Sequence, residues 1–173
     1  MFILEKLIMK KKCCIVGLGY IGLPTAALLA DSGYQVIGFD LNKRIIEKVN
    51  SGKTHIIERN LDQLVSKAVS EGSLIAKLTP SKADNFLITV PTPFRNDLKN
   101  SLSLPKPDLS YVFSAIDSII PYLCKDNLII IESTCPVGTT NEILEYIFNK
   151  TRFSKNDLKI AYCPERVLPG NTL

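Results

Sequence analysis

The sequence contains few of the side chains that usually build metal sites. His55 is its single histidine, and the five cysteines have no spacing typical of metal ligands. The adjacent pair Cys13 and Cys14 suits a buried strand better than a metal-binding clip. We therefore expect no metal site, and we expect reduced, mostly buried thiols in a cytoplasmic protein. The cysteines are Cys13, Cys14, Cys124, Cys135 and Cys163.

Other classes of protein are disfavoured by what the chain lacks. No apolar run reaches the roughly 18 residues that a membrane-spanning helix needs. The first 12 residues place their basic run after the apolar stretch, which argues against a signal peptide. The net charge of +4 is spread along the chain, without a basic groove that contains aromatic residues, so nucleic-acid binding is not expected. We expect residues 1–11 to be an extension and residues 12–173 to form the domain.

Short apolar runs alternate with longer amphipathic segments from residue 13 to the end of the chain. This alternation predicts an α/β fold, a Rossmann-like doubly wound parallel sheet in three α/β/α layers. Residues 94–107 have no periodicity and are predicted to form a loop. In the helix predicted over 108–123, Tyr111, Ala115, Ile119 and Tyr122 are expected to share one face. The strands are predicted at 13–16, 35–39, 74–78, 86–90, 128–131 and 158–162, and the other helices at 24–31, 43–49 (capped by Asn42), 61–70 (opened by Asn60) and 140–149.

The segment GLGYIG at residues 17–22 matches the pattern G-x-G-x-x-G. This pattern alone can be only a turn, but here it lies between a predicted buried strand and a predicted helix. In that context Gly17 permits the tight turn, Gly19 lets a dinucleotide pyrophosphate approach the backbone, and Gly22 lets the helix pack against the strand. The amino terminus of the helix then offers free N–H groups to the pyrophosphate.

Asp40 follows the second predicted strand, 18 residues after Gly22. A carboxylate there can accept hydrogen bonds from the adenosine ribose hydroxyls, and it repels the 2′-phosphate of NADP, so NAD is the expected cofactor. The alternative is that Asp40 only caps the following turn. Lys43 and Arg44 lie close by and weaken the argument for strict selectivity.

Three later segments follow predicted strands: VPTPF at 90–94, ESTCPVGTT at 132–140 and YCPERVLPG at 162–170. The carboxyl ends of parallel strands meet at one edge of the sheet, so we expect all three segments beside the glycine loop. Together with GLGYIGLPT at 17–25, they resemble the UDP-glucose/GDP-mannose dehydrogenase family. The resemblance runs from about residue 12 to the last residue, and within the family it is closest to members that act on UDP-N-acetylmannosamine.

The resemblance implies a role for several residues. Tyr20, Ile21, Asp40, Thr92 and Thr134 would bind NAD, together with the three glycines of the loop. Glu165 would place substrate or water, with Thr134 in support, and Arg166 and Val167 would contact the UDP-sugar. Without the family, Thr92 and Thr134 could simply end strands, and Glu165 and Arg166 could be a solvated pair on a loop.

Family members oxidise the C6 alcohol of a nucleotide sugar to a carboxylate in two NAD-dependent steps. The resemblance implies that the catalytic cysteine, a lysine and most substrate contacts lie in a carboxyl-terminal domain beyond the 173 residues. We therefore expect this chain to bind NAD without completing the reaction. It is expected to bind the UDP-sugar only together with that domain, and the protein is expected to form a homo-oligomer. The alternatives are a stand-alone NAD-binding module without catalysis and, less favoured, a β-hydroxyacid dehydrogenase domain.

Three residues need separate comment within this resemblance. Arg59 follows Glu58 at a position where the family usually has proline. Without proline, the backbone at the start of the next helix is expected to be less constrained. Cys135 is not the family's catalytic thiol. We expect His55 to have a structural role.

Overall fold

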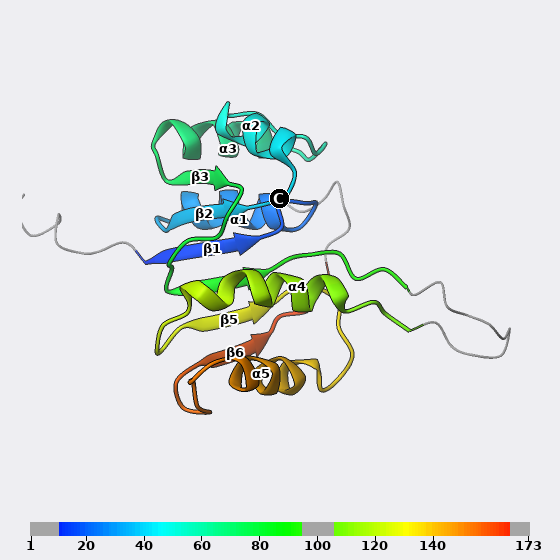
Figure 1. The fold of residues 1–173 in the computed structure, drawn as a ribbon. Helices are drawn as coiled ribbons and strands as arrows, with labels where there is room; N and C mark the ends of the chain where they lie inside the picture. Colours follow the sequence, from blue (N-terminus) through cyan, green and yellow to red (C-terminus); the bar gives the residue numbers. More distant parts are fainter. Residues whose placement is uncertain (1–10, 95–105, 167–173) are drawn as a thin grey trace, which may run out of the picture.

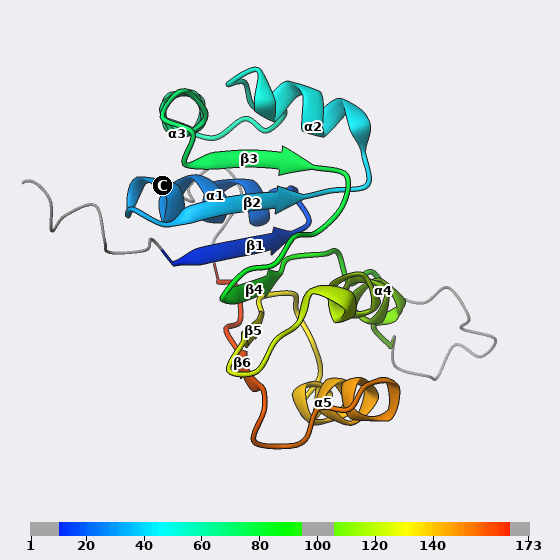
Figure 2. The ribbon, with the colours of Figure 1, turned by 60° about the vertical axis from the view of Figure 1, so that its left-hand side comes forward.

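The structure, a computed structural model, describes residues 11–94 and 106–166. Within these residues, the apolar runs form six parallel strands in one sheet, in the order β3-β2-β1-β4-β5-β6 (Figure 2). This order and the parallel pairing confirm the predicted doubly wound fold. The strands are β1 (Lys12–Val16), β2 (Gln35–Phe39), β3 (Leu74–Lys77), β4 (Asn85–Ile88), β5 (Leu128–Ile131) and β6 (Lys159–Tyr162).

Helices cover both faces of the sheet, with α1 behind it and α4 in front of it in the view of Figure 1. One apolar core lies between the sheet and α1, α2 and α3, and a second lies between the sheet and α4 and α5. Successive residues of β1 enter the two cores in turn, because side chains alternate across a strand. The helices are α1 (Gly22–Asp31), α2 (Lys43–Asn50), α3 (Leu61–Ser70), α4 (Ser110–Ile119) and α5 (Thr139–Lys150), and a 3₁₀ turn, η2 (Ile120–Tyr122), follows α4.

The helix predicted over 108–123 is shorter than expected, and of the four residues expected on one face only Ala115 and Ile119 are buried. Tyr111 is 49% exposed, whereas Val112 and Ile116 are fully buried with Ala115 and Ile119. The buried positions 112, 115, 116 and 119 form a stripe with the helical period of 3.6, and Tyr111 lies beside this stripe. Pro121 then lies in η2, where the last turn tightens.

The helix entries predicted from single residues differ in their hydrogen bonds. Asn42 caps α2 as predicted, because its side chain accepts a hydrogen bond from the Arg44 amide at 3.0 Å. Asn60 is the N-cap residue of α3, but its side chain makes no capping bond and its φ of 62° is left-handed. The start of α3, which follows directly after Arg59, therefore lacks the ordinary side-chain cap.

The carboxyl ends of five strands lie in one row across the sheet. Val16 pairs with Phe39 on one side and with Ile88 on the other. Ile88 then pairs with Ile131, and Ile131 with Tyr162. The residue that follows each of these strand ends therefore lies at the same edge of the sheet. These residues are Gly17, Asp40, Thr89, Glu132 and Cys163. Sequence segments far apart in the chain meet there, as predicted.

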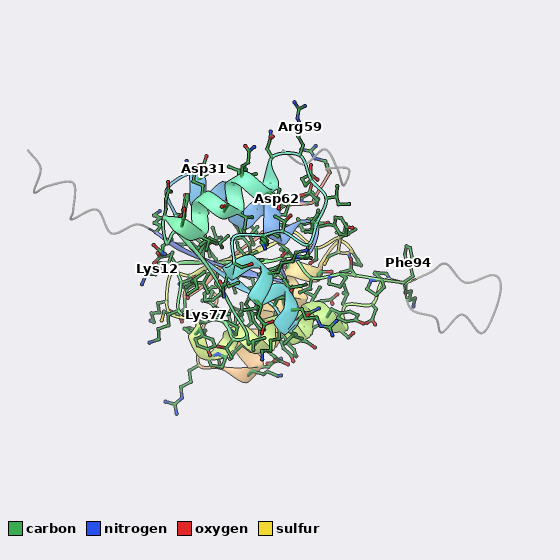
Figure 3. The ribbon with its side chains drawn as sticks, turned by 90° about the horizontal axis from the view of Figure 1, so that it is seen from above. Lys12, Asp31, Arg59, Asp62, Lys77 and Phe94 are labelled. Atoms are coloured by element: carbon green, nitrogen blue, oxygen red, sulfur yellow. The ribbon has the colours of Figure 1, made fainter. Side chains whose placement is uncertain are left out.

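Two predicted features fall outside the described residues or close to their limit. Most of the predicted loop 94–107 and the extension up to residue 10 are not described. Phe94, the last described residue before the gap, lies apart from the body of the domain and is 68% exposed (Figure 3). None of the helices in the described ranges is long and apolar enough to cross a membrane.

Candidate cofactor-binding site

The glycine loop connects β1 to α1 through two close backbone approaches. Gly17 has a φ of 98°, a conformation that side chains other than glycine rarely adopt. A Cβ atom added to Gly22 would lie 1.8 Å from the carbonyl oxygen of Gly17. Both glycines are therefore required by the fold itself, as predicted for the tight turn and for the packing of α1.

Gly19 differs from these two glycines because it faces open space. A Cβ atom built on it would meet no atom of the protein within 4 Å. Helix α1 begins three residues later, at Gly22, without a side-chain cap and without an acidic residue in its first turn. The amino-terminal N–H groups of α1 and its positive dipole end are thus available to an anion, and glycine at position 19 leaves room for one.

Thr89 holds the glycine loop from the next strand. Its hydroxyl donates to the carbonyl oxygens of Val16 at 3.0 Å and Gly17 at 2.7 Å. Its backbone N–H donates to the same Val16 carbonyl at 2.9 Å and so extends the β1–β4 ladder. The hydroxyl and the backbone N–H of Thr89 therefore hold the start of the glycine loop in place without a ligand.

Asp40 lies at the end of β2, directly beside the loop. Its Oδ2 accepts a hydrogen bond from the Leu18 amide at 2.9 Å, and its Oδ1 accepts one from the Asn42 amide at 2.8 Å. The turn-capping role that was considered as an alternative is therefore present. Each carboxylate oxygen has a further lone pair, so the same group can still accept hydrogen bonds from ribose hydroxyls.

Two pockets lie on either side of the glycine loop. The smaller one, of about 220 Å³, is lined by Asp40 and Leu41 on one side and by Pro91, Tyr111 and the α4 surface on the other. The larger one, of about 490 Å³, lies beyond β1, over the ends of β4 and β5. Its lining residues are Gly19, Tyr20, Ile21, Thr89, Val90, Pro91, Thr92, Glu132, Ser133, Thr134 and Glu165. We name these the β2 pocket and the β5 pocket.

Most of the predicted site residues that the structure describes line one or the other of these two pockets. Tyr20, Ile21, Thr92, Thr134 and Glu165 line the β5 pocket, and Asp40 lines the β2 pocket. The structure therefore brings together residues that are up to 145 positions apart, from Tyr20 to Glu165.

The last predicted segment is described only in part. The Glu165 Oε1 accepts a hydrogen bond from the backbone N–H of Arg166 at 2.7 Å, and the Arg166 side chain is not among the groups that line the β5 pocket. Val167 lies outside the described residues. The proposed contacts of Arg166 and Val167 with a UDP-sugar therefore stay predictions.

Glu132 is a site residue that the sequence did not single out. It follows β5 directly and lines the β5 pocket, where burial and the negative charge of Glu165 raise its pKa to about 7, against the opposing effect of a hydrogen bond with Thr25. Its Oε2 atom is buried, and no described residue forms a hydrogen bond with it. The only signal in the sequence is a charged residue directly after a buried apolar strand.

The expectation of mostly buried thiols is wrong. Cys13 and Cys14 are buried in β1, whereas Cys135 is half-buried and Cys124 and Cys163 are exposed. Burial raises the pKa of the Cys135 thiol, which makes it a weak nucleophile at neutral pH and agrees with the view that it is not the catalytic thiol. The exposed cysteines lie in segments after α4 and after β6, where backbone connections run over the surface.

His55 lies closer to the glycine loop than its expected structural role suggests. Its ring forms a hydrogen bond with the backbone of Leu18 and feels the charge of Asp40, yet burial lowers its pKa. Its Nδ1 atom is buried, without a hydrogen-bond partner among the described residues. Burial therefore favours the neutral imidazole, which lies beside the backbone of the glycine loop.

Comparison with known proteins agrees with this geometry. Residues 11–173 match the UDP-glucose/GDP-mannose dehydrogenase family, NAD binding domain. The chain is 45% identical over 170 residues to a UDP-N-acetyl-D-mannosamine dehydrogenase of Campylobacter jejuni, an alignment that covers 94% of this chain and 40% of that protein. It is 44% identical over 167 residues to an NDP-N-acetyl-D-galactosaminuronic acid dehydrogenase of Ralstonia nicotianae, covering 92% of this chain and 38% of that protein.

A solved structure shows the same arrangement in three dimensions. The native UDP-N-acetyl-mannosamine dehydrogenase of Staphylococcus aureus superposes with a TM-score of 0.83 at 40% identity, covering 92% of this chain and 38% of that one. The chain thus spans about 40% of the length of the Campylobacter relative. On this evidence the chain belongs to the UDP-glucose/GDP-mannose dehydrogenase family and carries its NAD-binding domain.

Proposed function

We propose that this chain holds NAD across the β2 and β5 pockets as the hydride acceptor of a nucleotide-sugar 6-dehydrogenase. The observation that carries the proposal is the position of the glycine loop between two pockets, with Asp40 in one and the ends of β4 and β5 in the other. A dinucleotide has the matching form, two nucleosides joined by a pyrophosphate. The pyrophosphate would lie at Gly19 and the start of α1, where the open space and the uncapped helix amides are.

The two nucleosides then follow from the position of Asp40. This carboxylate would accept hydrogen bonds from the adenosine ribose, with the adenine in the β2 pocket near Tyr111. The nicotinamide half would lie in the β5 pocket with Tyr20, Ile21, Thr92 and Thr134. When bound there, NAD supplies the hydride-accepting ring, and the residues of this chain supply its orientation and surroundings.

The proposed substrate is UDP-N-acetylmannosamine, oxidised at C6 to the uronate for polysaccharide biosynthesis. Support comes from the Campylobacter and Staphylococcus relatives and from the position of Glu165 in the β5 pocket. Glu165 would place the sugar or a water molecule beside the ring, with Thr134 in support, and Arg166 and Val167 would contact the sugar nucleotide. The thiol and lysine of the reaction would come from a part of the enzyme that corresponds to the length of the relatives that this chain does not span, in a homo-oligomer.

The proposal also includes a cytoplasmic location. All five cysteines are unpaired, although two of them are exposed. Exposed free thiols suit a reducing compartment, where disulfides seldom persist.

A chimeric enzyme tests this function directly. Residues 11–173 would replace the matching segment of the Campylobacter relative, and NADH formation from UDP-N-acetylmannosamine would be followed by absorbance. We expect turnover with NAD, and its loss when Glu165→Ala is introduced in the same chimera. A matched control, Glu145→Gln, changes an exposed glutamate on α5 and should leave turnover intact. A folded chimera that binds NAD but forms no NADH would support the alternative, an NAD-binding module without catalysis.

A further inference from the structure

Two carboxyl groups from neighbouring strands line the same wall of the β5 pocket. Glu132 follows β5, and Glu165 lies three residues after the end of β6. The last residues of these strands, Ile131 and Tyr162, are paired in the sheet, and the Cys163 amide continues the ladder by donating to Ile131 at 2.9 Å. The two glutamates are thus held near each other by the backbone.

The Glu132 side chain reaches a poorly solvated position. Its Oε2 is buried without a partner among the described residues, while its carboxyl group forms a hydrogen bond with Thr25 of α1. Burial, followed by the charge of Glu165, raises the pKa of Glu132 to about 7. Near neutral pH, this group therefore exchanges a proton readily.

The described lining of the β5 pocket is poor in charged groups other than these two glutamates. Among the described residues that line the β5 pocket there is no lysine, arginine or histidine. The start of α1 contributes the Tyr20 phenol, and the β4 segment Thr89–Thr92 contributes no ionisable side chain. The charge that Glu132 acquires on ionisation is therefore negative, and none of the described lining residues carries a positive charge.

The nicotinamide ring proposed for this pocket is positively charged in only one of its two redox states. The oxidised nicotinamide ring is a cation, and the reduced ring is neutral. A nearby carboxylate attracts the cation, and the cation in turn favours the ionised form of the carboxyl group. The neutral ring offers no such gain.

We propose that Glu132 and Glu165 form a charge-sensing pair that favours the oxidised cofactor and releases a proton to solvent when it binds. Conversely, when the bound nicotinamide ring is reduced and becomes neutral, the pair takes up a proton from solvent. The carboxyl group then no longer attracts the ring by its charge. This inference rests on the proposed placement of NAD. It adds that the ionisation of Glu132 and Glu165 distinguishes the oxidised from the reduced cofactor.

The sign of the pH dependence follows from proton release. Affinity for NAD⁺ should rise with pH as Glu132 ionises, because the proton no longer has to leave on binding. Affinity for NADH should stay flat or fall slightly. A ring that lowers the carboxyl pKa by one unit changes affinity by about tenfold between the acid and alkaline limits.

The test is the affinity of the 173-residue chain for NAD⁺ and NADH between about pH 5 and about pH 8, a range that includes the raised pKa of Glu132. Calorimetry in two buffers of different ionisation enthalpy counts the protons released. We expect about a tenfold rise in NAD⁺ affinity over this range, with proton release on binding NAD⁺ alone. Glu132→Gln should remove most of both effects, and Glu145→Gln on the exposed face of α5 should leave them unchanged.

The outcomes separate this inference from the proposed function. Binding of both cofactor forms with the same pH-independent ratio and no proton release would overturn the charge-sensing pair and leave NAD binding intact. Failure to bind either form would overturn the proposed function itself. If Glu132→Gln does not fold, as judged by circular dichroism, Glu165→Gln and the proton count of the unaltered chain still decide the question.

Discussion

Asp40 combines two duties, so its removal should have two effects. Its oxygens hold the Leu18 and Asn42 amides and face the β2 pocket. We expect Asp40→Ala to weaken NAD binding by about tenfold, because hydrogen bonds to a charged group contribute about 1.5 kcal/mol. NADP binding should change less, since the repulsion of its 2′-phosphate is lost as well. Isothermal titration with both nucleotides measures the ratio.

A matched variant separates the two duties of Asp40. Asp40→Asn keeps an oxygen that can accept from Leu18 but removes the charge that repels NADP. It should therefore preserve the melting temperature better than Asp40→Ala while still eroding the preference for NAD. Equal affinity of the unaltered chain for NAD and NADP would contradict the assignment of Asp40.

His55 should make stability depend on pH. Burial lowers its pKa below the ordinary value of 6.5, so the unfolded chain binds a proton more readily than the folded one. The stability due to neutral His55 is thus fully present above about pH 6.5 and falls as the pH drops through that value towards the lower folded-state pKa. Urea unfolding across this range measures the loss. His55→Gln, which cannot titrate, should flatten the curve in this window; an unchanged slope would assign the effect to other groups.

At the scale of elements, the strand–loop–helix unit offers two glycines with opposite roles. Gly22→Ala places a Cβ atom against the Gly17 carbonyl and should cost about 3 kcal/mol of stability or more, as overpacking does. Gly19→Ala meets no protein atom and should change stability by only about 0.5 kcal/mol.

Cofactor binding should show the reverse contrast for these two glycines. We expect Gly19→Ala to lose at least about tenfold in NAD affinity, or about 1.4 kcal/mol, because its methyl group occupies the space proposed for the pyrophosphate. Thermal unfolding and NAD titration of both variants provide the comparison. A Gly19→Ala chain with unchanged NAD affinity would move the pyrophosphate away from this loop.

The elements that sequence predicts best are those governed by local pattern. The β1–loop–α1 unit could be predicted because a buried strand, positive-φ glycine and helix start each have a residue signature. The buried side of α4 could not be read from the sequence, because Tyr111 and Val112 can both lie on an apolar stripe and only packing against the sheet buries Val112. Glu132 was missed for a related reason: its desolvation depends on α1 and on Glu165, which are far away in the sequence.

At the scale of the whole molecule, the 173-residue chain should bind NAD without oxidising a sugar nucleotide. Burial raises the pKa of Cys135, so this thiol is a poor nucleophile for holding an aldehyde. We expect no NADH formation from pure protein, NAD and UDP-N-acetylmannosamine. Sustained turnover would mean that Cys135 or the exposed Cys163 had been misjudged, and a Cys-to-Ser variant at each position would identify which.

The row of strand ends also bears on how the domain assembles during synthesis. Val16 and Ile88 are partners in the sheet although 72 positions separate them. Contacts this distant form slowly, because a long stretch of chain must first be closed. The β2 pocket takes its walls from both sides of this junction, and the β5 pocket needs β5 and the segment after β6 as well. During synthesis, the pocket proposed for adenosine can therefore form once α4 has left the ribosome, whereas the pocket proposed for nicotinamide can form only when nearly all of the described residues have left it.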